Sequence, residues 1–69
     1  MSICEGKPSW PELIGVSAEI AVQTIQNENS SVRAIVRSIN DPIPFDFRCD
    51  RVFVIVDDQG IVVRVPYVG

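Results

Sequence analysis

The feature of this sequence that most constrains its fold is a proline-stiffened connection between two apolar, β-branched runs. The connection covers residues 40–51 and separates runs at 32–37 and 52–56, which their composition predicts as strands. Pro42 and Pro44 each hold φ at about −65° and push the preceding residue toward extended geometry. Connections of this length in a short chain are usually functional or disordered. The prolines favour the first case, a rigid, extended and exposed loop.

The prolines of this loop alternate with residues that keep their backbone N–H groups. In an extended segment the amides of Ile43 and Phe45 point along the same edge. That edge can pair with the backbone of a partner while Phe45, near the apex of the loop, fills a pocket. The alternative is a surface loop that only connects two strands and carries an incidental aromatic side chain.

The segment before the loop predicts one amphipathic helix. Gly15 and Ser17 mark its start, with Ser17 as the N-cap, and Glu19 suits the positive end of the helix dipole. The polar cluster at 27–31 marks its end. An apolar stripe at helical spacing is formed by Ala18, Ala21, Val22 and Ile25. Core packing explains this stripe better than a partner does, and Trp10 is interpreted as a core anchor too.

The segment after the loop completes a small sheet. The run at 52–56 is apolar on both faces, which is typical of a central strand. Residues 57–60 carry turn signals, and 61–65 can return antiparallel before Pro66 ends regular pairing. A chain of 69 residues has room for one core. We therefore expect residues 1–69 to form a single domain, an open α+β sandwich of one helix on a short sheet.

Two cysteines, Cys4 and Cys49, bear on stability. They are too far apart for a CxxC redox pair, and the chain has no histidine to complete a zinc site. So small a domain buries a modest fraction of its surface, and this favours a disulfide over two buried free thiols. Closing a loop of about 45 residues would stabilise the fold by roughly 4 kcal/mol in the entropic description.

The amino-acid composition argues against an enzyme and against a metal-binding protein. Without histidine, acid–base or nucleophilic catalysis is poorly supported. Asp41, Asp46 and Asp50 could form an acid pair or a weak calcium site, but flanking arginines favour ordinary salt bridges. We expect a binding protein without metal or cofactor.

The net charge and the hydropathy of the chain argue against nucleic acids and membranes as binding partners. The net charge is −3 and the few basic residues are scattered, so nucleic acid is not an expected partner. No apolar run approaches the length of a membrane span, and none resembles a signal peptide, so membrane association is not expected. The compartment stays open on these grounds.

Three separated motifs resemble the potato inhibitor I family of serine protease inhibitors. They are SWPELIG at 9–15, PFDFRCDRV at 44–52 and VPYVG at 65–69. The family includes eglin, the barley chymotrypsin inhibitor and the disulfide-containing squash, flax and buckwheat inhibitors. The resemblance spans nearly the whole chain in the family's order and spacing. It implies that the two long strands run parallel, which makes the short sheet mixed, and that the loop spans its open edge.

The resemblance also implies substrate-like inhibition rather than catalysis. Aligned by motif, the scissile bond is Phe45–Asp46, with Phe45 entering the primary specificity pocket of the protease. The implied protease-binding loop comprises Asp41, Pro42, Ile43, Pro44, Phe45, Asp46, Phe47 and Arg48. Chymotrypsin-like and subtilisin-like enzymes are the expected partners, and trypsin is a poor target because Phe45 leaves the aspartate of its pocket unpaired. A monomer, secreted or vacuolar in a plant tissue, is the family expectation.

The resemblance implies loop support with two departures. Cys4 is expected to pair with Cys49, and Arg51 and Gly69 are expected beneath the loop. Eglin and its barley relative carry threonine and arginine where this chain has Pro44 and Phe53. We therefore expect loop rigidity to depend on Pro44, the disulfide and Arg51, with Asp46 and the terminal carboxylate of Gly69 as partners of Arg51. The alternative is a non-inhibitory interaction or storage module that uses the same loop.

Overall fold

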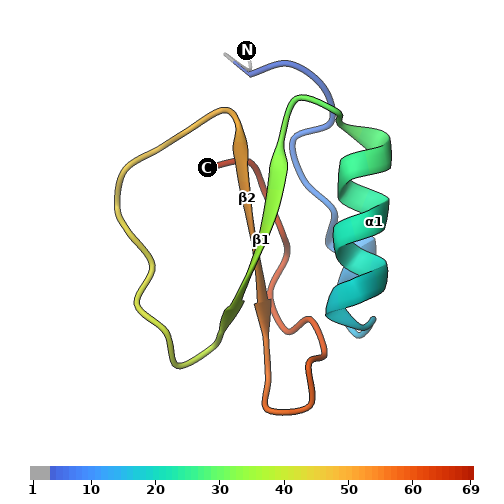
Figure 1. Ribbon diagram of the computed structural model, residues 1–69, viewed down its shortest axis with the longest axis vertical. Coiled ribbons are helices and arrows are strands. Elements are labelled where there is room, and N and C mark those ends of the chain that lie inside the picture. Colours follow the sequence, from blue (N-terminus) through green and yellow to red (C-terminus); the bar gives the residue numbers. More distant parts are fainter. Residues whose placement is uncertain (1–3) are drawn as a thin grey trace.

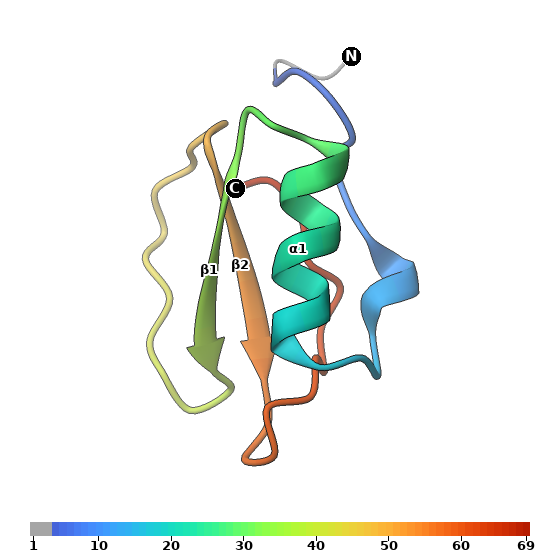
Figure 2. The ribbon, with the colours of Figure 1, turned by 45° about the vertical axis from the view of Figure 1, so that its right-hand side comes forward.

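The computed structural model describes residues 4–69, which form one helix packed on a small sheet (Figure 1). The element order is a 3-10 turn η1 (Pro11–Leu13), helix α1 (Ala18–Glu28), and strands β1 (Arg33–Ser38) and β2 (Arg51–Val56). Helix α1 lies against one face of the strands (Figure 2). This is the predicted open α+β sandwich. None of the helices in the described range is long and apolar enough to cross a membrane.

Helix α1 begins and packs as its sequence predicts. Ser17 is the N-cap, and its hydroxyl accepts a hydrogen bond from the Ile20 N–H at 3.4 Å. Ala21 and Ile25 are buried, and Ala18 and Val22 pack against the same core. The core also includes the fully buried Trp10 of the N-terminal arm, whose indole N–H donates to Glu28 at 3.1 Å. The predicted stripe and core anchor are confirmed.

Strands β1 and β2 are parallel, in a register that runs from Arg33 opposite Arg51 to Ser38 opposite Val56. A parallel pair cannot be joined by a tight turn, because the chain must return the full length of the strand before it re-enters the sheet. This geometry accounts for the long connection at 39–50. Strand β1 is shifted by one residue from the predicted range, and Val36 near its end is exposed.

Strand β2 lies at the centre of the sheet. Its second edge forms antiparallel bridges, Val52 with Val68 and Val56 with Val62, which makes the sheet mixed. The predicted return strand at 61–65 is reduced to isolated bridges at Ile61 and Val62. The Val63 N–H donates to the Ile55 carbonyl of β2, whereas the main-chain groups of Val62 point to the other edge and bond to Val16 and to Gly15. Val52 and Val54 are fully buried on the side of the helix, and alternation turns Phe53 and Ile55 to the opposite face.

Candidate functional site

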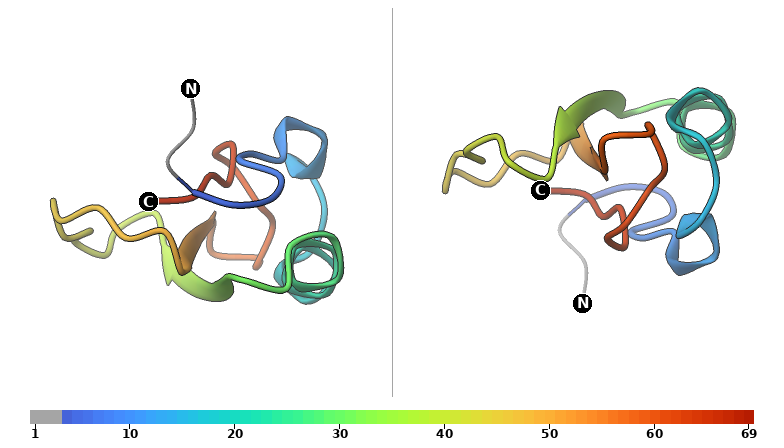
Figure 3. Two further views of the ribbon diagram at one scale, coloured as in Figure 1. Left: turned by 90° about the horizontal axis from the view of Figure 1, so that it is seen from above. Right: turned by 90° about the horizontal axis from the view of Figure 1, so that it is seen from below.

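The connection between β1 and β2 is the most exposed part of the described chain. It extends away from the body on the side opposite α1, which the view from above shows clearly (Figure 3). Every residue from 39 to 50 is exposed. Phe45 reaches 106% of its reference exposure, whereas Ile43 and Phe47 reach 37% and 58%. Exposure of a large apolar side chain to water is unfavourable in free energy. We therefore expect the Phe45 side chain to be buried against a binding partner.

Side-chain bonds order the start of the loop. The Ser38 N–H donates to the Asp41 carboxylate at 3.0 Å, and the Asp41 N–H donates to the Ser38 carbonyl at 2.9 Å. Ile39 continues the sheet by donating to the Val56 carbonyl at 2.8 Å. Asp41 therefore fixes the direction in which the chain leaves β1, and its carboxylate is occupied by this turn.

The following segment, from Pro42 to Phe45, offers its backbone to solvent. Residues 42–44 form no helix, strand or turn, and no residue other than glycine in the described chain has a positive φ, so the backbone here is not strained into the left-handed region. Within residues 4–69, the N–H groups of Ile43 and Phe45 donate no hydrogen bond. Together with the prolines, which have no N–H, this leaves two amides and an exposed aromatic ring open to a partner.

Arg51, the first residue of β2, holds the far side of the loop. Its Nη2 donates to the main-chain oxygen of Asp46 at 2.6 Å, and the Asp46 carboxylate lies 3.4 Å from the same guanidinium. Its Nε donates to the main-chain oxygen of Gly69 at 2.8 Å, and the Gly69 N–H returns a bond to the Arg51 carbonyl at 2.9 Å. The Arg51 side chain is only 11% exposed. The structure thus brings Arg51 together with Asp46 and Gly69, the two partners that the family resemblance implies for it.

A second arginine forms a separate pair further along. Arg48 donates to both carboxylate oxygens of Asp50, at 3.0 and 2.9 Å. These hydrogen bonds lower the pKa of Asp50 and raise the pKa of Arg48. Both side chains are more than half exposed, so water screens the pair and it adds little to stability. The described residues contain no group of three or more side chains that could hold a metal ion.

The disulfide predicted between Cys4 and Cys49 is present, with the two Cα atoms 5.2 Å apart. It joins the N-terminal arm to the returning end of the loop, across a sequence separation of 45 residues. Next to it, the main-chain N–H of Arg33 donates to the Asp50 carbonyl at 2.9 Å, so that end of the loop is fixed both by the disulfide and by the sheet.

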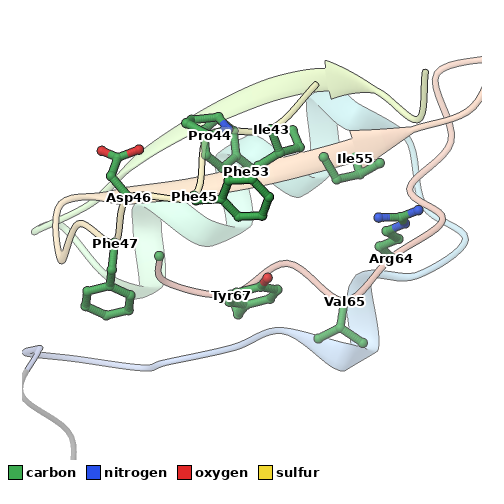
Figure 4. A pocket seen from close by; sticks show the side chains of 11 residues that line it. Ile43, Pro44, Phe45, Asp46, Phe47, Phe53, Ile55, Arg64, Val65 and Tyr67 are labelled. Atoms are coloured by element: carbon green, nitrogen blue, oxygen red, sulfur yellow. The ribbon is translucent and has the colours of Figure 1, made fainter. Parts of the chain in front are cut away.

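A hollow of about 350 Å³ separates the loop from the outer face of the sheet (Figure 4). Its walls are mostly apolar and include Ile43, Pro44, Phe47, Phe53, Ile55 and Tyr67. The ring of Phe53, one of these lining residues, also contacts Arg51, whose guanidinium carbon lies 4.7 Å from the ring centroid. Sequence reasoning treated both faces of β2 as core and missed this stacking. The spacing of Arg51 and Phe53, two apart on one strand, is the signal that could have found it.

Comparison with known proteins agrees with the motifs. The profile of the Potato inhibitor I family matches residues 4–69. A protein from Linum usitatissimum named "Proteinase inhibitor" is 49% identical over 65 residues, which cover 94% of both chains. A "Trypsin/subtilisin inhibitor" from Amaranthus caudatus is likewise 49% identical over 65 residues and covers 94% of each chain.

The fold has a solved counterpart at similar identity. The crystal structure of bitter gourd trypsin inhibitor superimposes with a TM-score of 0.94 at 46% identity, covering 99% of this chain and 100% of that one. Family profile, relatives and fold all extend over nearly the entire chain, so the likeness is not confined to one motif. This chain belongs to the potato inhibitor I family of protease inhibitors.

Proposed function

We propose that this chain inhibits serine proteases as a tightly bound substrate analogue, with Phe45–Asp46 as the bond presented to the enzyme. The observation that carries this proposal is the contrast across that bond. Phe45 is fully exposed, while the main-chain oxygen of the next residue, Asp46, is held by Arg51 at 2.6 Å. One side of the bond is free to enter an enzyme, and the other is anchored to the scaffold.

In this proposal, successive residues of the loop occupy successive positions along the active site of the protease. Phe45 fills the primary specificity pocket, and Ile43 and Pro44 lie on its acyl side. Asp46, Phe47 and Arg48 occupy the leaving side. The free N–H groups of Ile43 and Phe45 add a short strand to the backbone of the enzyme. The serine, histidine and oxyanion hole that attack the carbonyl carbon of Phe45 all belong to the protease.

Inhibition follows from how little the loop changes on binding and on cleavage. A preformed extended loop loses little conformational entropy when it docks, so more of the contact energy appears as affinity. If the protease breaks the C–N bond between Phe45 and Asp46, Arg51 still holds the carbonyl of Asp46 and the disulfide still holds Cys49. The new amine remains beside the acyl-enzyme at high effective concentration, so resynthesis competes with hydrolysis.

Phe45 also sets the proposed preference for chymotrypsin-like and subtilisin-like enzymes over trypsin. An aromatic ring suits a deep apolar pocket but leaves the carboxylate of a trypsin-like pocket unpaired. Relatives from Amaranthus caudatus and bitter gourd carry trypsin in their names, so the scaffold is compatible with that enzyme. In our proposal the side chain at position 45 makes the difference, and one chain binds one protease as a monomer.

The test is Phe45→Lys, measured as inhibition constants against chymotrypsin and trypsin. We expect the preference to invert by at least about a hundredfold, because a buried ion pair is gained in one pocket and a buried apolar contact is lost in the other. Phe47→Lys is the matched control, since Phe47 is also an exposed loop aromatic and lies two residues further on. An unchanged preference for Phe45→Lys, or an equal inversion for Phe47→Lys, would contradict the proposed bond. Rapid cleavage of the unaltered chain without inhibition would indicate a storage or interaction module instead.

A further inference from the structure

We infer that Phe53 is a positioning residue for the loop, because its ring holds the Arg51 guanidinium in the orientation that binds the main-chain oxygen of Asp46. The inference rests on the proposed function, since that oxygen lies on the leaving side of the proposed reactive bond. It assigns to the second residue after Arg51 on β2 a role that goes beyond core packing.

The contact itself is a cation over an aromatic face. The guanidinium carbon of Arg51 lies 4.7 Å from the centroid of the Phe53 ring. Arg51 and Phe53 are two residues apart on β2 and so lie on the same face of that strand. The Phe53 ring borders the hollow beneath the loop (Figure 4). The Arg51 side chain is 11% exposed. Attraction between a cation and a ring is strongest where water is excluded, so this site favours it.

Two bonds of Arg51 depend on the plane of its guanidinium. Its Nε donates to Gly69 and its Nη2 to Asp46, at 2.8 and 2.6 Å. Both donors belong to one rigid planar group, so rotation of that plane weakens both bonds at once. A ring stacked on the guanidinium opposes this rotation and consumes none of its donors. Leucine at position 53 would preserve apolar packing but could not provide the aromatic face.

The ring also faces the other half of the loop. Phe53 lines the hollow together with Ile43 and Pro44, which precede Phe45. One side chain of the central strand therefore borders the segment before the proposed bond and orients the arginine that holds the segment after it. Phe53 therefore lies where it can keep the chain segments before and after the 45–46 bond close to each other when that bond is cut.

The experiment compares Phe53→Leu with Phe53→Trp, each in the unaltered chain and in an Arg51→Ala background. The measured quantity is the equilibrium ratio of chain cleaved at 45–46 to intact chain, reached with a catalytic amount of chymotrypsin or subtilisin. We expect Phe53→Leu to raise this ratio about three- to tenfold, the range of a partly desolvated cation–ring contact. Phe53→Trp keeps the ring and should stay within about twofold of the unaltered chain.

The double variants separate positioning from packing. If Phe53 acts through Arg51, Phe53→Leu should have no added effect once Arg51→Ala is present. An equal rise in both backgrounds, or a rise shared by Phe53→Trp, would overturn the inference and leave Phe53 as a packing residue. The free energy of unfolding, measured for all variants, would then account for the change in the ratio.

A second measurement needs no protease, so it distinguishes failure of the inference from failure of the proposed function. In the free protein, the Arg51 side-chain Nε–H should exchange slowly with water, and Phe53→Leu should accelerate that exchange several-fold while Phe53→Trp leaves it slow. Unchanged exchange in Phe53→Leu refutes the inference even if the chain inhibits. Accelerated exchange in a chain that inhibits no protease refutes the proposed function and retains the ring–arginine contact.

Discussion

The Nη2 of Arg51 lies 2.6 Å from the main-chain oxygen of Asp46, and this bond ties the exposed loop to the central strand. Charge-assisted bonds of this kind are about twice as strong as neutral ones. The same guanidinium also bonds to Gly69. Stiffness of the sheet is thereby transmitted to one specific atom of the loop, next to the bond that we propose the protease attacks.

Arg51→Ala should convert a slow substrate into a faster one. The variant loses its bonds to Asp46 and Gly69, so the leaving side can drift from the acyl group after cleavage. Hydrogen bonds to a charged group contribute about 1.5–3 kcal/mol, which corresponds to a roughly ten- to hundredfold faster loss of the intact 45–46 bond. The measurement is the lifetime of intact chain under catalytic protease.

Arg33→Ala provides the matched control for this variant. Arg33 pairs with Arg51 in the register of the sheet but is exposed on the edge strand. Its removal should leave the lifetime nearly unchanged. A lifetime that Arg51→Ala does not shorten, or that both variants shorten alike, would remove the assigned role of Arg51.

Removal of the disulfide should weaken the whole fold. Replacing both Cys4 and Cys49 by serine releases a loop closed over a separation of 45 residues. The free energy of unfolding should fall by about 4 kcal/mol, as the entropic description of such a loop predicts. Denaturant titration with and without reductant measures this effect, and reductant should lower the stability of the unaltered chain only. A loss below about 1 kcal/mol would mean that the unfolded chain gains little freedom.

Local sequence signals predicted the helix and its cap, the exposed loop and the disulfide. These features depend on residues that are close in sequence, or on a pair of cysteines that had no other partner. Parallel pairing of β1 and β2 was available only through the family resemblance, because alternation of apolar residues does not encode strand direction. The return strand at 61–65 was overestimated, because only Ile61 and Val62 form bridges and the alternation of apolar residues does not show where pairing ends.

In the candidate site, too, some features could be predicted from the sequence and others could not. Proline spacing marked the loop, and the motif placed Arg51, Asp46 and Gly69 together. The stacking of Arg51 on Phe53 was missed because an apolar residue in a strand is compatible with core packing on either face. Only the three-dimensional position of the loop reveals that Phe53 faces the hollow instead of the helix.

Gly6 should tolerate alanine much less well than Gly15 does. Both have positive φ, +82° and +93°, so alanine is strained at either position by roughly 1–2 kcal/mol. At Gly6 an added Cβ would also lie 2.6 Å from the side-chain nitrogen of Asn29, whereas Gly15 has open space. Asn29 cannot move freely, because it is buried and bonds to Glu5, Lys7 and Ser31.

The comparison therefore isolates this close contact. Gly6→Ala should cost about 1–3 kcal/mol more in unfolding free energy than Gly15→Ala, the usual range for overpacking. Thermal or denaturant unfolding of the two variants decides the point. Equal losses would show that Asn29 moves aside without penalty.

The Arg48–Asp50 pair should contribute to stability only above acidic pH. Because hydrogen bonds from Arg48 lower the pKa of Asp50, the folded state binds that proton less readily than the unfolded state does. The contribution is complete above the ordinary aspartate pKa of about 4, and it is lost as the pH falls through the lower folded value.

The direction of this pH dependence can be tested with Arg48→Ala, made in the unaltered chain and in an Asp50→Asn background. Arg48→Ala should be slightly less stable than the unaltered chain at pH 7, since water screens the pair, and this small difference should shrink as the pH falls below about 4. In an Asp50→Asn background, Arg48→Ala should show no such pH dependence. A stability difference that stays constant between neutral and acidic pH would mean that Asp50 is not the responsible group.

The most direct test of the proposed inhibitory loop is to titrate chymotrypsin, subtilisin and trypsin with the intact chain and to measure the residual activity of each enzyme. The mass of the recovered inhibitor then shows whether and where it was cut. We predict stoichiometric loss of the first two activities, retained trypsin activity, and a recovered chain that is intact or cut only between Phe45 and Asp46. Full activity of all three enzymes, or inhibition with cleavage at another bond, would contradict the assignment of this loop and its reactive bond.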